Sequence, residues 1–363
     1  MYSPSEKKPG TGFSKKLLKW NREKNDRQMP WKGEKDPYKI WLSEIILQQT
    51  RVDQGLNYYK NFIAAFPDIH QLANAEDNKV FKLWEGLGYY TRCRNLLLTA
   101  RHISKTRNGK FPRTYQEIIQ LKGVGAYTAA AISSFAFNLP YAVVDGNVFR
   151  VISRVFGIST PADTTEGKKE FTQLADELLD KKEPGTYNQA IMDFGATVCK
   201  PLLPLCTQCV FKKDCVAFNQ NRIDELPVKQ KKITIKKRWF NYLVLEYNNQ
   251  LLIHERLKKD IWQHLYEFVI VETNKAINPE MLINSTIDQK LIKVKAYKIA
   301  GKPVKVKQLL SHQLINGLFV HITIKSKPAF KENYFLVSKE NLKQYPFPKL
   351  INDYIKQGLE EKK

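Results

Sequence analysis

Four of the five cysteines in this chain fall within seventeen residues, and this cluster constrains the fold more than any other feature. Cys206 and Cys209 form a C-x2-C pair, and Cys199 and Cys215 flank it in the spacing C-x6-C-x2-C-x5-C. Zinc sites usually combine two such pairs, whereas four thiolates in one compact loop also suit an iron–sulfur cluster. In a reducing compartment these cysteines indicate metal binding rather than disulfides, and zinc and iron–sulfur both remain open.

The charge of the chain points to its partner. It carries 59 Lys and Arg against 36 Asp and Glu, a net charge of +23, which favours binding to a polyanion such as nucleic acid. A hydrophobic content of 43% is ordinary for a globular chain, and we expect no membrane-spanning run. The N-terminus lacks the apolar stretch of a signal peptide, so we expect a cytoplasmic protein, associated with the nucleoid if bacterial.

Hydrophobic periodicity divides the chain into two domains. Residues 1–221 predict an all-α domain, residues 222–238 a basic linker, and residues 239–363 an α+β domain in which the period shifts towards two. The helices expected in the first domain are 15–26, 37–51, 53–66, 76–85, 91–107, 114–120, 125–136, 147–156, 166–180 and 186–197. In the second we expect strands at 240–247, 250–254, 269–272, 294–299, 318–325 and 334–337, with helices at 278–285 and 338–344.

A glycine-rich turn joins two helical segments near residues 114–136. Gly123 and Gly125 would allow a tight turn with positive φ and expose backbone N–H groups at a helix N-terminus, where a phosphate oxygen can bind. Asp145 follows in a Val-Asp-Gly-Asn segment and precedes a helix. The local sequence alone favours a helix cap for Asp145 over a catalytic role, although one carboxylate can serve both purposes.

Glu44 lies in a helical segment with an apolar composition. At 100° per residue it projects between Ile40, Trp41 and Leu47 rather than onto a polar face. An exposed position is the usual fate of a helical Glu, but apolar neighbours disfavour the ionised form, so we expect a raised pKa for Glu44. Such a group can protonate a leaving group near neutral pH.

The segment around Glu44, W-L-S-E-I-I-L-Q-Q-T, closely resembles the signature of the adenine DNA glycosylases in the endonuclease III, or helix-hairpin-helix, superfamily. The cysteine spacing, the glycine turn and the downstream Asp145 resemble the same superfamily. The resemblance implies a helical glycosylase domain whose loop 199–215 holds a four-iron four-sulfur cluster on Cys199, Cys206, Cys209 and Cys215, beside a surface that contacts DNA phosphates.

The resemblance also assigns roles around the base to be removed. It implies that Glu44 protonates adenine and that Asp145 stabilises the sugar cation. Tyr127 stands where glycosylase/lyases of the superfamily carry a Schiff-base Lys, so the resemblance implies base removal without strand cleavage, with Tyr127 assisting near Asp145. The further residues that it implies contact the base or the DNA are Arg27, Met29, Trp31, Leu47, Gln49, Tyr89, Gly123, Gly125 and Gln189.

The second domain resembles the Nudix-like C-terminal domain of adenine DNA glycosylases. Ile261–Phe268, I-W-Q-H-L-Y-E-F, is similar to a segment of that fold, and Ser311 and His312 match the loop that touches 8-oxoguanine opposite the adenine. The chain lacks the Nudix box, so we expect this domain to recognise the base and not to hydrolyse nucleotides.

The resemblance as a whole therefore implies a monofunctional adenine DNA glycosylase, and we expect it to act as a monomer on duplex DNA with A:8-oxoguanine or A:G mispairs. Three other interpretations remain: an oxidised-pyrimidine glycosylase/lyase, a non-catalytic DNA-binding protein and a zinc-stabilised nucleic-acid adaptor. Tyr127 and the extra domain speak against the first, and the pairing of Glu44 with Asp145 speaks against the second.

Overall fold

The computed structural model describes residues 12–230, 234–294 and 296–357 of the chain. The N-terminal stretch in which no signal peptide was recognised lies outside these residues. The described residues form two compact units. The first unit comprises the described residues of Met1–Ala73 and Leu98–Lys232, and the second comprises those of Asn74–Leu97 and Ile233–Lys363. The segment Asn74–Leu97, which we expected within the helical domain, is therefore grouped with the C-terminal residues in the second unit.

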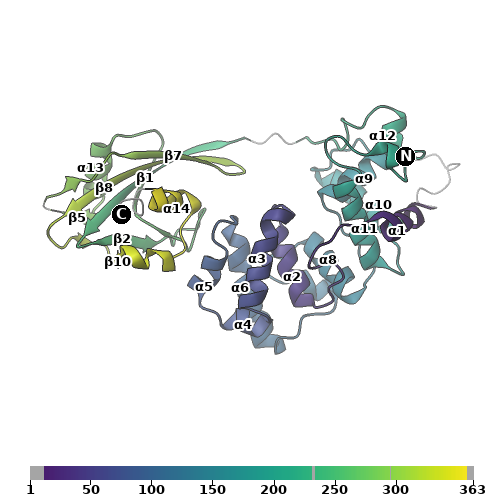
Figure 1. Ribbon diagram of the computed structural model, residues 1–363, viewed down its shortest axis with the longest axis horizontal. Coiled ribbons are helices and arrows are strands. Elements are labelled where there is room, and N and C mark those ends of the chain that lie inside the picture. Colours follow the sequence, from purple (N-terminus) through teal and green to yellow (C-terminus); the bar gives the residue numbers. More distant parts are fainter. Residues whose placement is uncertain (1–11, 231–233, 295, 358–363) are drawn as a thin grey trace. The chain divides into compact units, whose positions relative to one another are not determined.

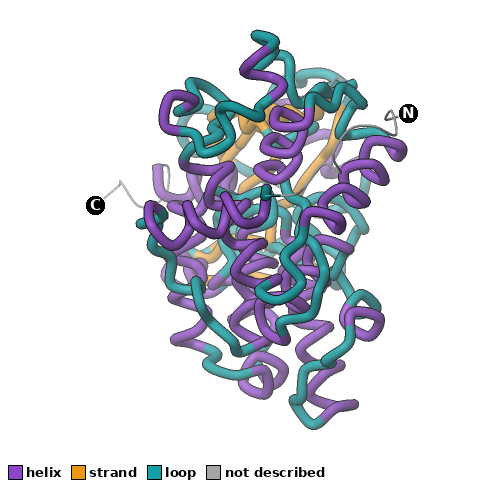
Figure 2. Tube along the Cα trace, turned by 90° about the vertical axis from the view of Figure 1, so that its right-hand side faces the viewer, coloured by secondary structure: helices purple, strands orange, loops and turns teal. Residues whose placement is uncertain are grey.

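The first unit is all helical (Figures 1 and 2). Its elements are α1 (Phe13–Lys24), α2 (Pro37–Leu47), α3 (Val52–Ala65), α4 (Ile69–Asn74), α7 (Tyr115–Ile118), α8 (Ala126–Phe137), α9 (Gly146–Phe156), α10 (Thr165–Leu178), α11 (Pro184–Thr197), the short 3-10 helix η1 (Cys206–Gln208) and α12 (Val216–Asn219). Helix α6 (Tyr90–Arg107) begins in the second unit and ends in the first. The predicted helices agree with these to within a few residues, whereas α4 and α12 are too short to show a period.

Close helix packing in the first unit brings α11 against the start of α9. A Cβ added to Gly195 of α11 would lie 2.6 Å from Cβ of Asn147, so only glycine permits this approach. Leu17 and Trp20 of α1, Val151 of α9 and Phe194 of α11 share one apolar core with Phe211 of the cysteine loop. The cysteine loop is thus packed onto the same core that positions α9 and α11.

The second unit is built on a mixed sheet of eight strands, drawn in orange in Figure 2. Five strands follow the order β10-β2-β1-β8-β6, while β3 pairs with β2, β4 with β1 and β7 with β8; only β1 and β8 run parallel among these pairs. The strands are β1 (Lys236–Tyr247), β2 (Gln250–Glu255), β3 (Tyr266–Glu267), β4 (Val269–Thr273), β6 (Lys298–Ile299), β7 (Val304–Leu309), β8 (Gln313–Ile324) and β10 (Tyr334–Ser338), and β5 (Ile292–Lys293) pairs separately with β9 (Ala329–Phe330).

Alternation along β1 and β8 gives this sheet two apolar faces. Leu243 and Val320 share a core with Leu282 of α13 (Pro279–Asp288). On the other face Phe319 stacks on Tyr354 of α14 (Lys349–Ile355), with ring centroids 4.2 Å apart. The unit also contains α5 (Asp77–Leu83) and the 3-10 helix η2 (Lys339–Gln344). The sheet is therefore covered on both sides, which is the α+β arrangement expected from the period.

Some boundaries differ from the sequence prediction. Strand β1 begins at Lys236, inside the segment 222–238 that was expected to be a linker. Strand β7 and helix α14 were not expected, and the predicted strand 294–299 contains only Lys298–Ile299 as strand, with residue 295 outside the described part. The alternation of valine and lysine at the start of β7 is a period-two strand signal that the sequence prediction did not use. Across the described residues, no helix is long and apolar enough to cross a bilayer.

Candidate active site

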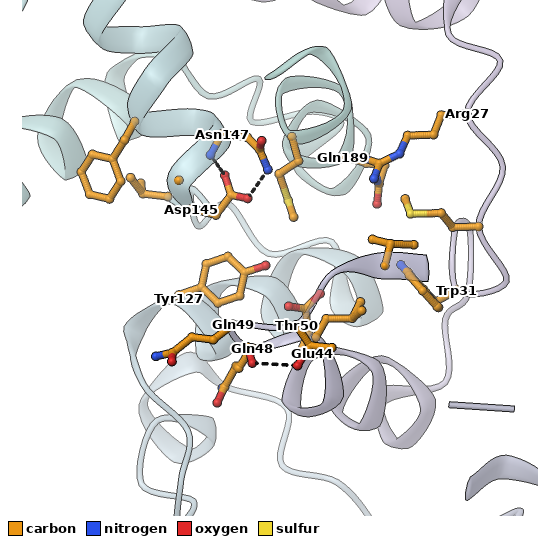
Figure 3. A pocket seen from close by; sticks show the side chains of 17 residues that line it. Arg27, Trp31, Glu44, Gln48, Gln49, Thr50, Tyr127, Asp145, Asn147 and Gln189 are labelled. Carbon is orange, nitrogen blue, oxygen red and sulfur yellow. Dashed lines mark hydrogen bonds between the residues drawn. The ribbon is translucent and has the colours of Figure 1, made fainter. Parts of the chain in front are cut away.

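A cavity of about 510 Å³ opens in the first unit between α2, α8, α9 and α11 (Figure 3). It brings together side chains that are far apart in the sequence. The predicted site residues that line it are Arg27, Met29, Trp31, Glu44, Leu47, Gln49, Tyr127, Asp145 and Gln189. Trp31 is held by an edge-to-face contact with Tyr59, with ring centroids 5.4 Å apart. One cavity therefore contains both predicted catalytic carboxyl groups and the residues expected to contact the base.

Glu44 lies in the third turn of α2, a helix that Asp36 caps by accepting a hydrogen bond from the Tyr38 N–H. The Glu44 side chain is 6% exposed, and burial raises its pKa to about 7. The nearby negative charge of Asp145 raises the pKa further, while a hydrogen bond from Tyr127 lowers it. The structure thus agrees with the raised pKa that we expected for Glu44 from its apolar neighbours. A pKa near 7 suits a group that donates a proton near neutral pH.

Tyr127 follows the first residue of α8 and points into the same cavity (Figure 3). Its hydroxyl donates a hydrogen bond to the Glu44 carboxylate, and burial beside Glu44 and Asp145 raises its pKa well above the usual value. Tyr127 therefore remains a neutral hydrogen-bond donor between two carboxyl groups.

Asp145 caps helix α9. Its Oδ1 accepts hydrogen bonds from the backbone N–H groups of Asn147 and Val148, both at 2.8 Å, and its Oδ2 accepts one from Asn147 Nδ2 at 2.7 Å. Burial raises the pKa of Asp145, and these three hydrogen bonds oppose that rise because they favour the ionised form. The predicted cap is present, and it fixes a carboxylate at the positive end of a helix dipole facing the cavity.

Gln189 and Arg27 meet at the far side of the cavity (Figure 3). Both donate a hydrogen bond to Oδ1 of Asp193, Gln189 from Nε2 and Arg27 from Nη1, each at 2.9 Å. Asp193 is fully buried in α11, one turn after Gln189, and did not feature in the sequence prediction. Asp193 could have been identified from the sequence, because it is a carboxylate inside an apolar helical segment and such a group needs a basic partner when it is buried.

Gln49 and Tyr89, the residues expected to insert into the duplex, share an uncommon backbone conformation. Their φ angles are +56° and +49°, in the left-handed region that costs a non-glycine residue energy. Tyr89 is 42% exposed and lines a second cavity, of about 450 Å³, within the second unit. Ser311 and His312 line that cavity as well, and the hydroxyls of Tyr89 and Ser311 are hydrogen-bonded. Ser311 and His312, the residues expected to contact the opposite base, thus share a cavity with Tyr89.

The glycine turn lies between α7 and α8 with both glycines exposed. Gly123 has the expected positive φ, +82°, but Gly125 has φ −97° and is the N-cap of α8. The turn thus has its positive φ at Gly123, whereas the chain is already extended at Gly125, where it enters α8. A Cβ at Gly125 would meet nothing within 4 Å, so what this glycine provides is open access to the helix N-terminus.

The four clustered cysteines lie at the ends of helices: Cys199 lies two residues after α11, Cys206 begins η1, Cys209 follows η1 and Cys215 is the N-cap residue of α12. All four thiols are free and close enough to influence one another's charge. Burial raises the pKa of Cys209 to about 12, so thiolates would need a compensating cation here. Arg154 Nη1 donates to Cys199 Sγ and the Phe211 N–H donates to Cys209 Sγ, as suits sulfurs that bear negative charge.

No group of three or more His, Cys, Asp or Glu side chains is close enough to hold a metal ion, as far as the described residues go. The four cysteine thiols of the loop 199–215 nevertheless lie near enough to influence one another's charge.

Comparisons with known proteins agree with this geometry. Residues 42–179 match the family model of the HhH-GPD superfamily base excision DNA repair proteins, and residues 241–357 match that of the NUDIX domain. The adenine DNA glycosylase of Buchnera aphidicola subsp. Schizaphis graminum is 35% identical over 288 residues, which cover 78% of this chain and 82% of that protein. The human adenine DNA glycosylase is 42% identical over 226 residues, which cover 60% of this chain and 41% of that protein.

The chain belongs to the adenine DNA glycosylase family. It is a DNA glycosylase, an enzyme that hydrolyses N-glycosyl bonds, and it acts on DNA. A solved thermostable thymine-DNA glycosylase is 29% identical, with a TM-score of 0.54 over 58% of this chain and 96% of that chain. A trapped endonuclease III–DNA covalent intermediate, 20% identical with a TM-score of 0.50 over 57% of this chain and 94% of that one, shares the fold. The predicted fold class and family are therefore confirmed.

The glycosylase cavity contains further residues that the sequence prediction did not include. Asn147 holds the Asp145 carboxylate, and Gln48 donates from Nε2 to Thr128 Oγ1 at 3.1 Å, which joins α2 to α8. Asn147 could have been found from the Asp-Gly-Asn segment, since an Asp side chain commonly accepts a hydrogen bond from the backbone two residues further on. The remaining additional lining residues are Thr50, Val52, Val144, Gly146, Phe149 and Met192.

Proposed function

We propose that this glycosylase removes adenine mispaired with 8-oxoguanine or guanine in duplex DNA and leaves an abasic site without cutting the strand. The observation that carries the proposal is the convergence of Glu44, Tyr127 and Asp145 on one cavity of about 510 Å³. A base must leave the helical stack to enter such a cavity, at a cost of a few kcal/mol. Gln49 and Tyr89, held in left-handed backbone conformations, would insert into the duplex and offset that cost.

Glu44 acts as the general acid in this proposal. With a pKa of about 7 it carries a proton in a large fraction of molecules at neutral pH and donates it to N7 of adenine. Adenine then leaves as a neutral base when the bond from C1′ to N9 breaks, and the sugar becomes an oxocarbenium ion. The residual negative charge of Glu44 is stabilised by the hydrogen bond from Tyr127.

Asp145 stabilises the cation that this step creates. The helix cap holds its carboxylate rigidly, so the negative charge needs no reorganisation as positive charge develops at C1′. Water then adds to C1′ and loses one proton, which completes the hydrolysis. The two carboxyl groups divide the work as they do in glycoside hydrolysis, one donating a proton and the other stabilising the sugar.

Tyr127 is the reason for proposing base removal alone. Strand cleavage by the lyase route needs an amine to form a Schiff base with C1′. The residues that line this cavity in the described part of the chain include Arg27 but no lysine. A phenol with a pKa well above its usual value cannot replace an amine in that step.

The C-terminal unit recognises the opposite base in this proposal. Ser311 and His312 line the second cavity and supply hydrogen-bonding groups, and Tyr89 reaches the same cavity. A four-iron four-sulfur cluster on Cys199, Cys206, Cys209 and Cys215 would supply no chemistry to the base; it would fix the loop that presents Lys200, Lys212 and Lys213 to DNA phosphates. We further propose that the protein works as a monomer in the compartment that contains the genome.

The test is incubation of the protein with a duplex that contains one adenine opposite 8-oxoguanine, followed by mild alkali. We expect a strand break at the adenine only after the alkali step. A break without alkali would exclude the monofunctional assignment, and an intact strand after alkali would exclude adenine removal. A duplex with adenine opposite thymine is the matched control and should remain intact.

A further inference from the structure

Asp193 is a buried ionic centre behind the base cavity. Its side chain is fully buried, yet its two oxygens accept hydrogen bonds from three donors and form an ion pair with Lys32. Oδ1 accepts from Arg27 Nη1 and Gln189 Nε2, both at 2.9 Å. Oδ2 accepts from Asn25 Nδ2 at 2.9 Å and lies 3.2 Å from Lys32 Nζ. A carboxylate without water needs such partners, and Asp193 obtains them from the segment 25–32 and from its own helix.

This contact determines which way the Gln189 amide points. A carboxylate only accepts hydrogen bonds, whereas an amide group has one face that donates and one that accepts. Turning the Gln189 amide over would place its oxygen against Oδ1 of Asp193, and two buried acceptors in contact repel each other. Asp193 therefore fixes Nε2 of Gln189 towards itself, which leaves Oε1 as the atom that Gln189 offers to the cavity.

A fixed acceptor in this position distinguishes purine bases by the group at carbon 6. Adenine carries an amino group there, which donates a hydrogen bond, whereas hypoxanthine and guanine carry an oxygen, which accepts one. An acceptor on Gln189 would pair with the amino group and repel the oxygen. A freely rotating amide would bind either base, because it could present its N–H instead.

We propose that Asp193 is a positioning residue that sets the base specificity of this glycosylase by holding the Gln189 amide in one orientation. The proposal rests on the proposed function, since it requires that the base enter the cavity lined by Gln189. Asp193 touches no substrate itself; it acts through Gln189 and, by the same oxygen, restrains Arg27. The cavity thus selects adenine through a buried charge that lies outside its lining.

The experiment compares single-turnover excision of adenine and of hypoxanthine, each opposite 8-oxoguanine, by the wild-type protein and by Asp193→Asn. Asparagine has nearly the same shape but can donate to Gln189, which permits the reversed amide. We expect the ratio of the adenine rate to the hypoxanthine rate to fall on the order of tenfold, the effect of one hydrogen bond gained or left unsatisfied. Equal slowing of both bases would overturn the proposal, because loss of structure alone would act on both.

Gln189→Leu provides the matched variant, since it deletes the amide but leaves Asp193 in place. We expect it to lower the same ratio, and we expect the double variant Asp193→Asn/Gln189→Leu to have the ratio of Gln189→Leu alone. Two results would refute the role of Asp193. One is an adenine-to-hypoxanthine rate ratio in Gln189→Leu that equals the wild-type ratio, and the other is a ratio in the double variant below that of Gln189→Leu. If Asp193→Asn does not fold, Gln189→Leu decides by the same criterion. Failure of the proposed function would be distinct, because the wild-type protein would then release neither base.

Discussion

Tyr127 donates a hydrogen bond to Glu44 across the cavity, although the two residues lie on different helices, α8 and α2. This contact and burial act on the Glu44 carboxyl in opposite directions. Burial raises the pKa of Glu44 to about 7, while the phenol favours the ionised form and lowers it. The balance keeps a proton available near neutral pH and stabilises the anion once the proton has gone, so both halves of general acid catalysis can be tested separately.

The first prediction concerns the pH dependence of excision. Because Glu44 must be protonated, the single-turnover rate should fall about tenfold per pH unit well above pH 7. Glu44→Gln should lose excision by at least ~10²-fold while still binding the duplex. A rate that rises above pH 7, or an active Glu44→Gln protein, would contradict the role of Glu44 as the acid.

The same residue should also make the free energy of unfolding depend on pH. The folded-state pKa of Glu44 lies above its ordinary value of 4.5, so its stabilising contribution is present at low pH and lost as pH rises through about 7. At pH 8 the buried charge should cost the wild-type protein roughly 1–3 kcal/mol, and Glu44→Gln should remove that cost. Urea unfolding of both proteins at pH 5 and pH 8 measures this. A Glu44→Gln protein that is less stable than wild type at pH 8 would show that the charge is better compensated than the burial implies.

Tyr127→Phe should shift the pH profile. It removes the donor that lowers the pKa of Glu44, so the alkaline fall of the excision rate should move to higher pH. At pH 7 the rate should drop, because the Glu44 anion loses its hydrogen bond after proton transfer. The pH profile of single-turnover excision supplies the measurement. An unshifted or acid-shifted profile would mean that Tyr127 does not act through Glu44.

Asp145→Asn separates the cap from the chemistry. Asparagine caps helices about as well as aspartate, so the free energy of unfolding should change by less than about 1 kcal/mol. Excision should fall by ~10²-fold or more because the negative charge facing C1′ is gone. Thr164 provides the control, since it caps α10 through the Gly167 N–H: Thr164→Ala should cost about 1 kcal/mol and leave excision intact. The reverse pattern would assign Asp145 to the cap alone.

Visible absorption tests whether the cysteine loop holds an iron–sulfur cluster. Cys209→Ala should abolish the brown absorption of an iron–sulfur cluster and lower DNA affinity, since the loop packs on the core through Phe211. Cys93 is buried elsewhere, so Cys93→Ala should keep the colour. Iron and zinc analysis of the purified protein completes the test: zinc in place of iron would exclude the cluster.

Ser311→Ala should affect the choice of opposite base. Ser311 lines the second cavity and is bonded to Tyr89, so its loss should reduce the preference for 8-oxoguanine over guanine opposite adenine by about tenfold. Rates measured at saturating protein on the two duplexes give that preference. A preference unchanged in Ser311→Ala would place the recognition of 8-oxoguanine elsewhere.

The sequence determined the features that depend on neighbouring residues. Helices of ten or more residues were predicted close to their observed bounds, because a period of 3.6 is visible over three turns. The cap by Asp145 and the apolar surroundings of Glu44 were predicted for the same reason, since partners one to four residues away are fixed once the helix forms. The family resemblance likewise depends on residues close together in the chain, namely the four clustered cysteines and the segment around Glu44.

The tertiary structure decided everything that joins distant segments. Three features link residues that have no periodic relation in the chain. Tyr127 contacts Glu44, and Asp193 accepts hydrogen bonds from Arg27 and Gln189. The segment Asn74–Leu97 is grouped with the C-terminal unit. The extended φ of Gly125 likewise depends on how the turn enters α8. A sequence pattern indicates which face of a helix is apolar. It does not indicate the partner of a buried charge, because that partner comes from whichever segment packs against the charge and replaces its lost hydration.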